Sequence, residues 1–123
     1  MKVLIIDDSS VARKTIALTV ETLGYAVIEA KNGTEGLNVL KEQSDQIALI
    51  MLDWNMPGMS GLEVLVEVRK DPQTNTIPVM MVTTEMERKN MVEAVKAGAN
   101  HYLTKPFTPE DLSVRVLQCL GVA

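Results

Sequence analysis

Residues 47–58 read Ile-Ala-Leu-Ile-Met-Leu-Asp-Trp-Asn-Met-Pro-Gly, an apolar run that leads directly into Asp53. An unbroken apolar run that ends at a Pro-Gly turn predicts a strand buried on both faces. Such strands occur mainly in parallel sheets that helices cover on both sides. Ligands of open α/β sheets bind just beyond the carboxyl ends of the strands, where Asp53 would lie. Taken alone, Asp53 could equally cap the turn that follows, so the other strand ends must decide.

Four further short runs also resemble strands, and a segment with helical periodicity follows each strand. The strands are expected at residues 3–6, 25–30, 47–52, 79–82 and 101–103. The helices are expected between Asp8 and Gly24, over about 34–43, between Ser60 and Asp71, over about 85–97, and from Thr108 through Leu120. This alternation predicts a parallel sheet with right-handed crossovers.

The relative polarity of the strands predicts their order. The first, third and fourth strands are continuously apolar and belong in the middle, whereas the second and fifth fit the edges. The order 2-1-3-4-5 satisfies this, which gives an α/β, doubly wound, flavodoxin-like (βα)5 fold with its switch point between strands 1 and 3. The first and fifth helices should cover one face, and the other three helices the opposite face.

Several local signals predict where helices begin and which residues they bury. Ser60 and Glu63 have the spacing of a capping box, and Thr108 is expected to cap the last helix. One of the two acids at 7 and 8 could cap the first helix. Val66 and Val95 are expected to point inward from the third and fourth helices.

Bulk composition limits the class of protein. The chain has 123 residues, which predicts a single domain over 1–123 with no output domain. Its net charge of -4 and the lack of clustered basic residues argue against nucleic-acid binding. One cysteine excludes an internal disulfide and favours a reducing compartment. The first apolar run ends at Asp7, too early for a signal peptide, and no run is long enough to span a membrane. A soluble, cytoplasmic protein is expected.

Charged and hydroxyl side chains follow four of the expected strands. Strand 1 ends in Asp7-Asp8, strand 3 in Asp53, strand 4 in Thr83 and strand 5 in Lys105. Each has an ordinary explanation by itself, as a turn residue, a strand terminus or a surface lysine. Together they place three carboxylates on one rim, where they repel one another unless a cation intervenes. Oxygen ligands of this kind favour Mg²⁺.

This combination predicts phosphoryl chemistry. A carboxylate beside Mg²⁺ can attack a phosphoryl group and form an acyl phosphate. Transfer requires positive charge or hydrogen-bond donors at the phosphoryl oxygens, and Mg²⁺, Lys105 and Thr83 can supply them.

Asp7-Asp8, Asp53, Thr83 and Lys105-Pro106 are together similar to the signature of response-regulator receiver domains, over essentially the whole chain. Within that family the sequence most resembles the single-domain chemotaxis regulators of the CheY type, through residues 53–57, 81–83, 97–99 and Tyr102. The resemblance implies two-component signalling, in which a histidine kinase donates a phosphoryl group to Asp53. It also implies a protein that catalyses its own phosphorylation and dephosphorylation and is not a turnover enzyme.

The resemblance also implies roles for residues around the acceptor. Asp8 would bind Mg²⁺ directly, Asp7 through water, and Asn55 through its backbone carbonyl, with Asp53 as a further ligand. Thr83 and Lys105 would contact the phosphoryl group, and the Lys105-Pro106 bond would be cis.

Three neighbouring positions are expected to tune dephosphorylation. Asn55 and Glu85 match family positions with that role. Thr84 departs from the alanine often found beside the switch threonine, and it could narrow access to the phosphoryl group.

The resemblance further implies a switch and a binding surface. Thr83 would swing toward the phosphoryl group, and Tyr102 would fill the space it leaves. The signal would leave through the fourth helix, fifth strand and fifth helix, at Met86, Arg88, Met91, Tyr102 and Arg115. The expected partners are a sensor histidine kinase, a target such as a flagellar switch protein, and a phosphatase, with the chain itself a monomer.

Other functions stay open at this stage. A phosphorelay intermediate or phosphate sink is the main alternative. A phosphatase of the haloacid-dehalogenase type would need an acid at position 55, where Asn55 stands. A flavin carrier would want a phosphate loop after strand 1, where Asp7-Asp8 repel phosphate. A receiver fold used only as a binding module is a fourth alternative.

Overall fold

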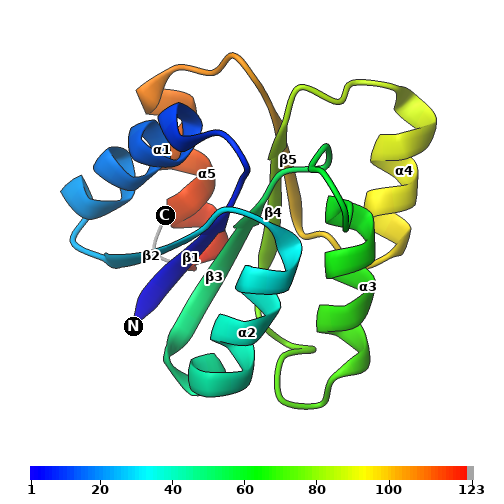
Figure 1. Cartoon of the computed structure of the whole chain (residues 1–123). Coiled ribbons are helices and arrows are strands. Elements are labelled where there is room, and N and C mark those ends of the chain that lie inside the picture. Colours follow the sequence, from blue (N-terminus) through cyan, green and yellow to red (C-terminus); the bar gives the residue numbers. More distant parts are fainter. Residues whose placement is uncertain (122–123) are drawn as a thin grey trace.

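A five-stranded parallel sheet forms the centre of the molecule (Figure 1). The structure is a computed structural model that describes residues 1–121, so the last two residues of the expected domain lie outside the described part. The strands are β1 (Lys2–Ile6), β2 (Ala26–Ala30), β3 (Ile47–Leu52), β4 (Val79–Thr83) and β5 (His101–Thr104). They lie in the order β2-β1-β3-β4-β5, which confirms the predicted topology.

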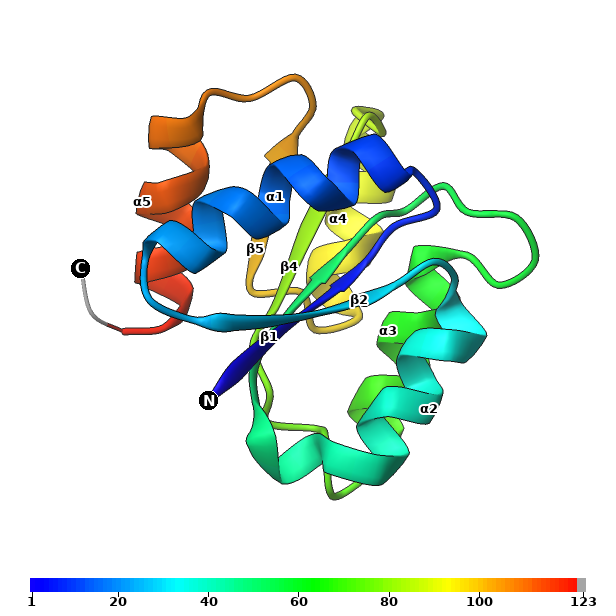
Figure 2. The same ribbon diagram turned by 60° about the vertical axis from the view of Figure 1, so that its left-hand side comes forward.

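Helices cover both faces of this sheet. They are α1 (Ser10–Thr22), α2 (Gly33–Gln43), α3 (Gly61–Lys70), α4 (Arg88–Lys96) and α5 (Pro109–Cys119), with a short 3-10 helix, η1 (Ser44–Gln46), before β3. Figures 1 and 2 show α1 and α5 on one face and α2, α3 and α4 on the other, as predicted. No helix within residues 1–121 is long and apolar enough to cross a membrane.

Alternate residues of the central strands feed two separate cores. Ile50 and Leu52 of β3 pack under α2, α3 and α4, whereas Leu49 and Met51 pack under α1 and α5. All four are essentially fully buried. Because a strand sends successive side chains to opposite faces, only a continuous apolar run can fill both cores, which is why the run at 47–52 forms a central strand.

Two capping predictions are confirmed and one is wrong. Ser60 and Glu63 form a reciprocal capping box at α3, and Thr108 accepts a hydrogen bond from the Asp111 amide at α5. The first helix, however, is capped by Ser9 and not by either preceding acid. Asp7 instead accepts a hydrogen bond from the Ser9 amide at 2.9 Å. Neither acid is therefore used as a helix cap, and both lie at the rim of the sheet.

Two side chains expected to be buried are exposed. Val66 lies on the outer side of α3, because this helix buries the stripe through Val64, Leu65 and Val68. Val95 is 61% exposed. The α4 helix begins at Arg88, later than expected, and buries only Ala94 completely, so its apolar stripe is too narrow to include Val95.

Candidate functional site

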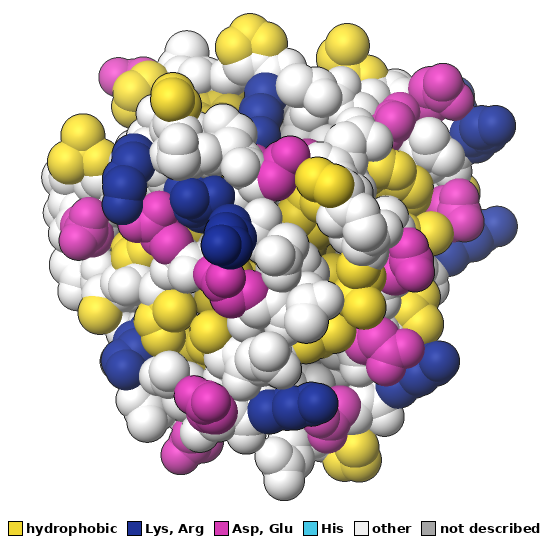
Figure 3. Space-filling view, viewed as in Figure 1, with side chains coloured by type: hydrophobic (Ala, Val, Ile, Leu, Met, Phe, Trp, Pro, Cys, Tyr) yellow, Lys and Arg dark blue, Asp and Glu magenta, His cyan; other side chains and the backbone are white. Residues whose placement is uncertain are grey.

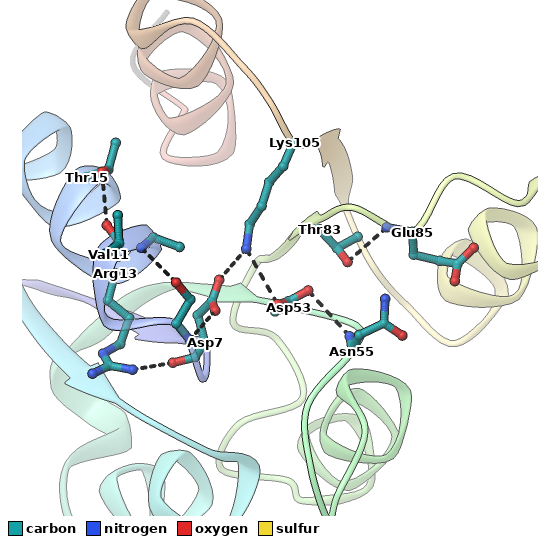
Figure 4. Close-up of polar contacts among 11 residues, drawn as sticks. Asp7, Val11, Arg13, Thr15, Asp53, Asn55, Thr83, Glu85 and Lys105 are labelled. Atoms are coloured by element: carbon teal, nitrogen blue, oxygen red, sulfur yellow. Dashed lines mark hydrogen bonds and ion pairs between the residues drawn. The ribbon is translucent and has the colours of Figure 1, made fainter.

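The predicted polar residues meet at the carboxyl ends of β1, β3, β4 and β5 (Figure 4). Ile6 and Leu52 are paired in the sheet, so the acids that follow them emerge side by side. Backbone bonds hold both strand ends: the Asp53 amide donates to the Ile6 carbonyl at 3.0 Å, and the Asp7 amide to the Ala30 carbonyl at 3.1 Å. Parallel pairing therefore determines the separation of the two carboxylates.

Asp7 and Asp8 have different surroundings although they are adjacent. Asp7 is buried, and its Oδ1 accepts from the Ser9 amide while its Oδ2 accepts from Lys105 Nζ at 2.6 Å. Asp8 is exposed, and no residue of the described chain donates a hydrogen bond to its carboxylate. Asp7 thus already has hydrogen-bond partners at both oxygens, whereas Asp8 keeps its oxygens open to a ligand.

Lys105 joins two of the acids. Its Nζ lies 2.6 Å from Asp7 Oδ2 and 3.5 Å from Asp53 Oδ2, and its side chain is only 18% exposed. The Lys105 amide donates to the Thr83 carbonyl at 2.9 Å, and the bond to Pro106 is cis, as expected. The ammonium therefore sits where it offsets repulsion between two buried carboxylates.

Burial dominates the ionisation of Asp53. Loss of solvent raises the pKa of the Asp53 carboxyl above its ordinary value. The Thr83 hydroxyl and the Lys105 ammonium act in the opposite direction, and the negative charge of Asp7 adds to the increase. A further hydrogen bond comes from the Asn55 amide at 3.4 Å. The net pKa increase shows that the surrounding donors compensate only part of the desolvation.

Thr83 and Tyr102 both contact the backbone of Glu85. Thr83 is fully buried, and its Oγ1 accepts from the Glu85 amide at 3.2 Å. The Tyr102 hydroxyl donates to the Glu85 carbonyl at 2.7 Å. Burial raises the pKa of Tyr102 to about 12, so the phenol stays protonated and able to donate at neutral pH. One residue of the β4–α4 loop therefore links the acceptor site to β5.

The residues expected to tune dephosphorylation flank the acceptor. Asn55 and Thr84 are exposed, and Glu85 is half-buried with its carboxylate accepting from the Glu87 amide at 2.8 Å. Trp54 and Asn55 also line an open hollow together with Met56, Pro57 and Ser60.

The residues of the expected binding surface lie around the edge of the sheet that β5 forms. Met86 and Arg88 are exposed, whereas Met91, Tyr102 and Arg115 are half-buried. They come from the β4–α4 loop, α4, β5 and α5, which Figure 1 shows around this edge of the sheet. Val92 and Val95 of α4 are exposed apolar residues in the same region, which sequence reasoning did not assign to this surface.

Sequence reasoning also missed two residues that contact the site through backbone atoms. A Cβ on Gly61 would lie 2.1 Å from the Asp53 carbonyl oxygen, so only glycine lets α3 begin this close to the acceptor. Arg13 of α1 donates to the Asp7 carbonyl. Neither contact involves a motif, and the one available signal was the position of Gly61 directly after the Ser60 cap.

The acidic cluster has the composition of a magnesium site. Asp7, Asp8 and Asp53 each offer a carboxylate oxygen, and these oxygens lie within 4.8 Å of one another. Lys105 is shared between Asp7 and Asp53, so its single positive charge does not balance the negative charges of the three carboxylates. Hard oxygen donors with room for water are the ligands that Mg²⁺ prefers, so the residues present fit this ion.

Comparisons with known proteins identify close relatives. A family model described as "Response regulator receiver domain" matches residues 3–117. Chemotaxis protein CheY1 of Helicobacter pylori is 43% identical over 98% of this chain and 98% of that protein. A CheY homologue of Campylobacter jejuni is 41% identical over 98% of this chain and 93% of its own length. The crystal structure of chemotaxis protein CheY4 of Vibrio cholerae superimposes with a TM-score of 0.87 at 35% identity, covering 97% of both chains.

Proposed function

Because the chain belongs to the response regulator receiver domain family, we propose that it accepts a phosphoryl group on Asp53 from a sensor histidine kinase. The observation that carries this proposal is the geometry at Asp53. A buried carboxylate at the end of a central strand has two further acids within 4.8 Å and an ammonium at 3.5 Å. Such a group can act as a nucleophile toward phosphorus while its neighbours stabilise the transferred charge.

In the proposed reaction, an Asp53 carboxylate oxygen attacks the phosphorus of a phosphohistidine. An O–P bond forms, the N–P bond breaks, and the imidazole leaves and takes up a proton. Asp53 must be ionised to attack, and Lys105 and Thr83 favour its ionised form. Bound Mg²⁺ would supply positive charge to the phosphoryl oxygens. Asp8, Asp53 and the Asn55 backbone carbonyl would hold the ion directly, and Asp7 would hold it through water.

The unequal environments of the two adjacent acids support this division of roles. Asp7 already accepts hydrogen bonds from the Ser9 amide and from Lys105, so it is suited to an indirect role. The exposed carboxylate of Asp8 is suited to direct ligation. Lys105 lies close enough to Asp53 to contact a phosphoryl group attached there.

Hydrolysis of the acyl phosphate returns the protein to its starting state. We assign the tuning of this step to Asn55, Thr84 and Glu85, because Asn55 follows the acceptor by two residues and the other two directly follow Thr83. The phosphoryl group is carried on the protein itself, so the chain is a self-modifying switch and not a turnover enzyme.

The downstream signal belongs to chemotaxis in this proposal. The relatives named above are chemotaxis proteins that match nearly the whole chain. The target would be a protein, such as a component of the flagellar switch, bound at the surface around α4, β5 and α5. A phosphatase would be a further partner, and the chain would act as a monomer without nucleic acid.

Intact-mass spectrometry after incubation with acetyl phosphate tests the proposal. The wild type should gain one phosphoryl group only when Mg²⁺ is present, and Asp53→Asn should gain none. Asp45→Asn is a matched control, because Asp45 is an exposed acid of η1 remote from the acceptor strand's carboxyl end. A phosphoryl group that remains on Asp53→Asn would refute the assignment of the acceptor.

A further inference from the structure

Arg13 reaches the acidic cluster from outside it (Figure 4). It lies near the start of α1, and its Nη1 donates to the backbone carbonyl of Asp7. Its Nε donates to Glu29 Oε1 of β2 at 3.2 Å. The Arg13 side chain is only 15% exposed, so the guanidinium is held between a strand end and an edge strand.

This contact fixes the peptide that joins the two adjacent acids. The Asp7 amide is bound to the Ala30 carbonyl at 3.1 Å, and Arg13 binds the Asp7 carbonyl. Both backbone polar groups of Asp7 therefore have partners. The carbonyl belongs to the Asp7–Asp8 peptide, whose plane determines the direction in which Asp8 leaves the strand.

No residue within 1–121 donates a hydrogen bond to the exposed Asp8 carboxylate. Hydrogen bonds also hold the residue that follows Asp8: the Ser9 carbonyl accepts from the Arg13 amide at 3.0 Å, and the Ser9 amide donates to Asp7 Oδ1. The orientation of Asp8 toward Asp53 thus depends on its backbone, and Arg13 binds the carbonyl of the Asp7–Asp8 peptide within that backbone.

Glu29 keeps the guanidinium in place. It accepts from Arg13 and also from Lys14 Nζ at 2.8 Å. Bonds from Lys14 and then from Arg13 lower the pKa of the Glu29 carboxyl, so it is ionised at neutral pH. A charge-assisted bond of this kind orients the planar guanidinium better than a neutral acceptor would.

We propose that Arg13 is a positioning residue for the cation site, which holds the Asp7–Asp8 peptide so that the Asp8 carboxylate faces Asp53. Glu29 assists by orienting the guanidinium. The proposal rests on the proposed function, since it assumes that the acidic cluster binds Mg²⁺.

Charge and position predict opposite effects at this residue. Arg13 is a cation near a cation site, so its charge alone opposes Mg²⁺ binding. If charge were its only effect, removing it would strengthen binding. If Arg13 positions Asp8, removing it weakens binding. Lys14 is a matched control, because it contacts the same Glu29 on the same helix but does not contact Asp7.

The test measures the Mg²⁺ dissociation constant. The fluorescence of Trp54, which directly follows Asp53 in the chain, reports the binding. Arg13→Met should raise the dissociation constant about fivefold or more, whereas Lys14→Met should leave it unchanged or lower it slightly. Arg13→Lys keeps the charge but loses the two-pronged contact, so it should behave like Arg13→Met. Urea unfolding without metal checks that each variant is folded.

The outcomes separate this inference from the proposed function. A wild type that binds no Mg²⁺ and gains no phosphoryl group overturns the proposed function itself. A wild type that binds Mg²⁺, together with an Arg13→Met variant that binds it equally or more tightly, overturns only the role of Arg13. If Arg13→Met does not fold, Arg13→Lys decides, because it keeps the charge: weaker Mg²⁺ binding supports the inference, and unchanged binding overturns it.

Discussion

At the scale of single residues, Asp53 combines burial with chemistry that needs a charge. Desolvation raises the pKa of this carboxyl, and Lys105 and Thr83 oppose the increase without cancelling it. The folded protein therefore contains a carboxylate that is less stable there than in water. A bound cation would stabilise this buried charge, and transfer of a phosphoryl group would consume the carboxylate as a nucleophile.

This arrangement predicts that Asp53→Asn stabilises the metal-free protein at neutral pH. The folded-state pKa is raised, so the folded form binds protons more readily, and stability falls as pH rises from about 3.8 through the raised value. At pH 7 the cost of the buried charge is fully present. Asn removes it, with an expected gain of about 1 kcal/mol, an ordinary size for one substitution. Lys105 keeps its closer partner, Asp7, in the variant.

Urea unfolding at pH 7 and at pH 4 measures this effect, and the gain should be smaller at pH 4. The exposed Asp45→Asn substitution removes the same charge elsewhere and should change the unfolding free energy little at either pH. An Asp53→Asn variant that is less stable than the wild type at pH 7 would contradict the account of burial given above.

At the scale of elements, the β4–α4 loop connects the acceptor to the edge strand. The Glu85 amide is bound by Thr83 and the Glu85 carbonyl by Tyr102. If Thr83 turns its hydroxyl toward a phosphoryl group, it releases the Glu85 amide. We expect the loop then to shift and Tyr102 to move with it, because the Tyr102 hydroxyl is bound to the carbonyl of the same residue.

We expect trapping of Asp53 with beryllium trifluoride, a phosphoryl mimic, to change the environment of Tyr102. Fluorotyrosine NMR can follow this, because the chain has two tyrosines and Tyr25 packs against the opposite core. The Tyr102 signal should shift and the Tyr25 signal should not. Thr83→Ala should abolish the Tyr102 shift. An unchanged Tyr102 signal in the trapped wild type would refute the coupled switch.

At the scale of the whole molecule, the site and the proposed binding surface occupy different parts of the same sheet. The acceptor lies at the carboxyl end of β3, in the middle, whereas α4 and β5 lie at one side (Figure 1). Exposed apolar residues are dispersed over the face in Figure 3, and α4 carries two of the exposed valines, Val92 and Val95. Apolar residues on an exposed helix are suited to a protein partner.

This surface predicts which substitutions weaken binding to a flagellar switch peptide. Met91→Ala and Arg115→Ala should each reduce the affinity of the phosphorylated protein about tenfold, a typical effect at an interface residue. Val66→Ala is the control, since Val66 is a partly exposed apolar residue of α3 that is not assigned to this surface.

Fluorescence anisotropy of the labelled peptide, with and without acetyl phosphate, makes the measurement. Unchanged affinity in both variants would refute the assigned surface. A phosphorylated wild type that ignores the peptide but passes its phosphoryl group to a second histidine would instead indicate a phosphorelay intermediate.

Local sequence determined the elements and the chemistry at their ends. Apolar runs set the strands, their polarity set the order, and strand-end residues such as Asp53 and Lys105 indicated the site, because periodicity and turn residues act over a few positions. Asp7 and Lys105 are 98 residues apart, yet parallel strands bring their elements to the same rim, so their meeting at this rim was predictable.

Tertiary packing decided what lies beyond the strand ends. The outward direction of Val95, the close approach of Gly61 to the acceptor and the contact of Arg13 with Asp7 depend on how each helix docks on the sheet. Backbone carbonyls carry no signature in the sequence, so a side chain that binds one leaves no motif. The acids of this site were therefore readable from the sequence, whereas the residues that hold them in place required the structure.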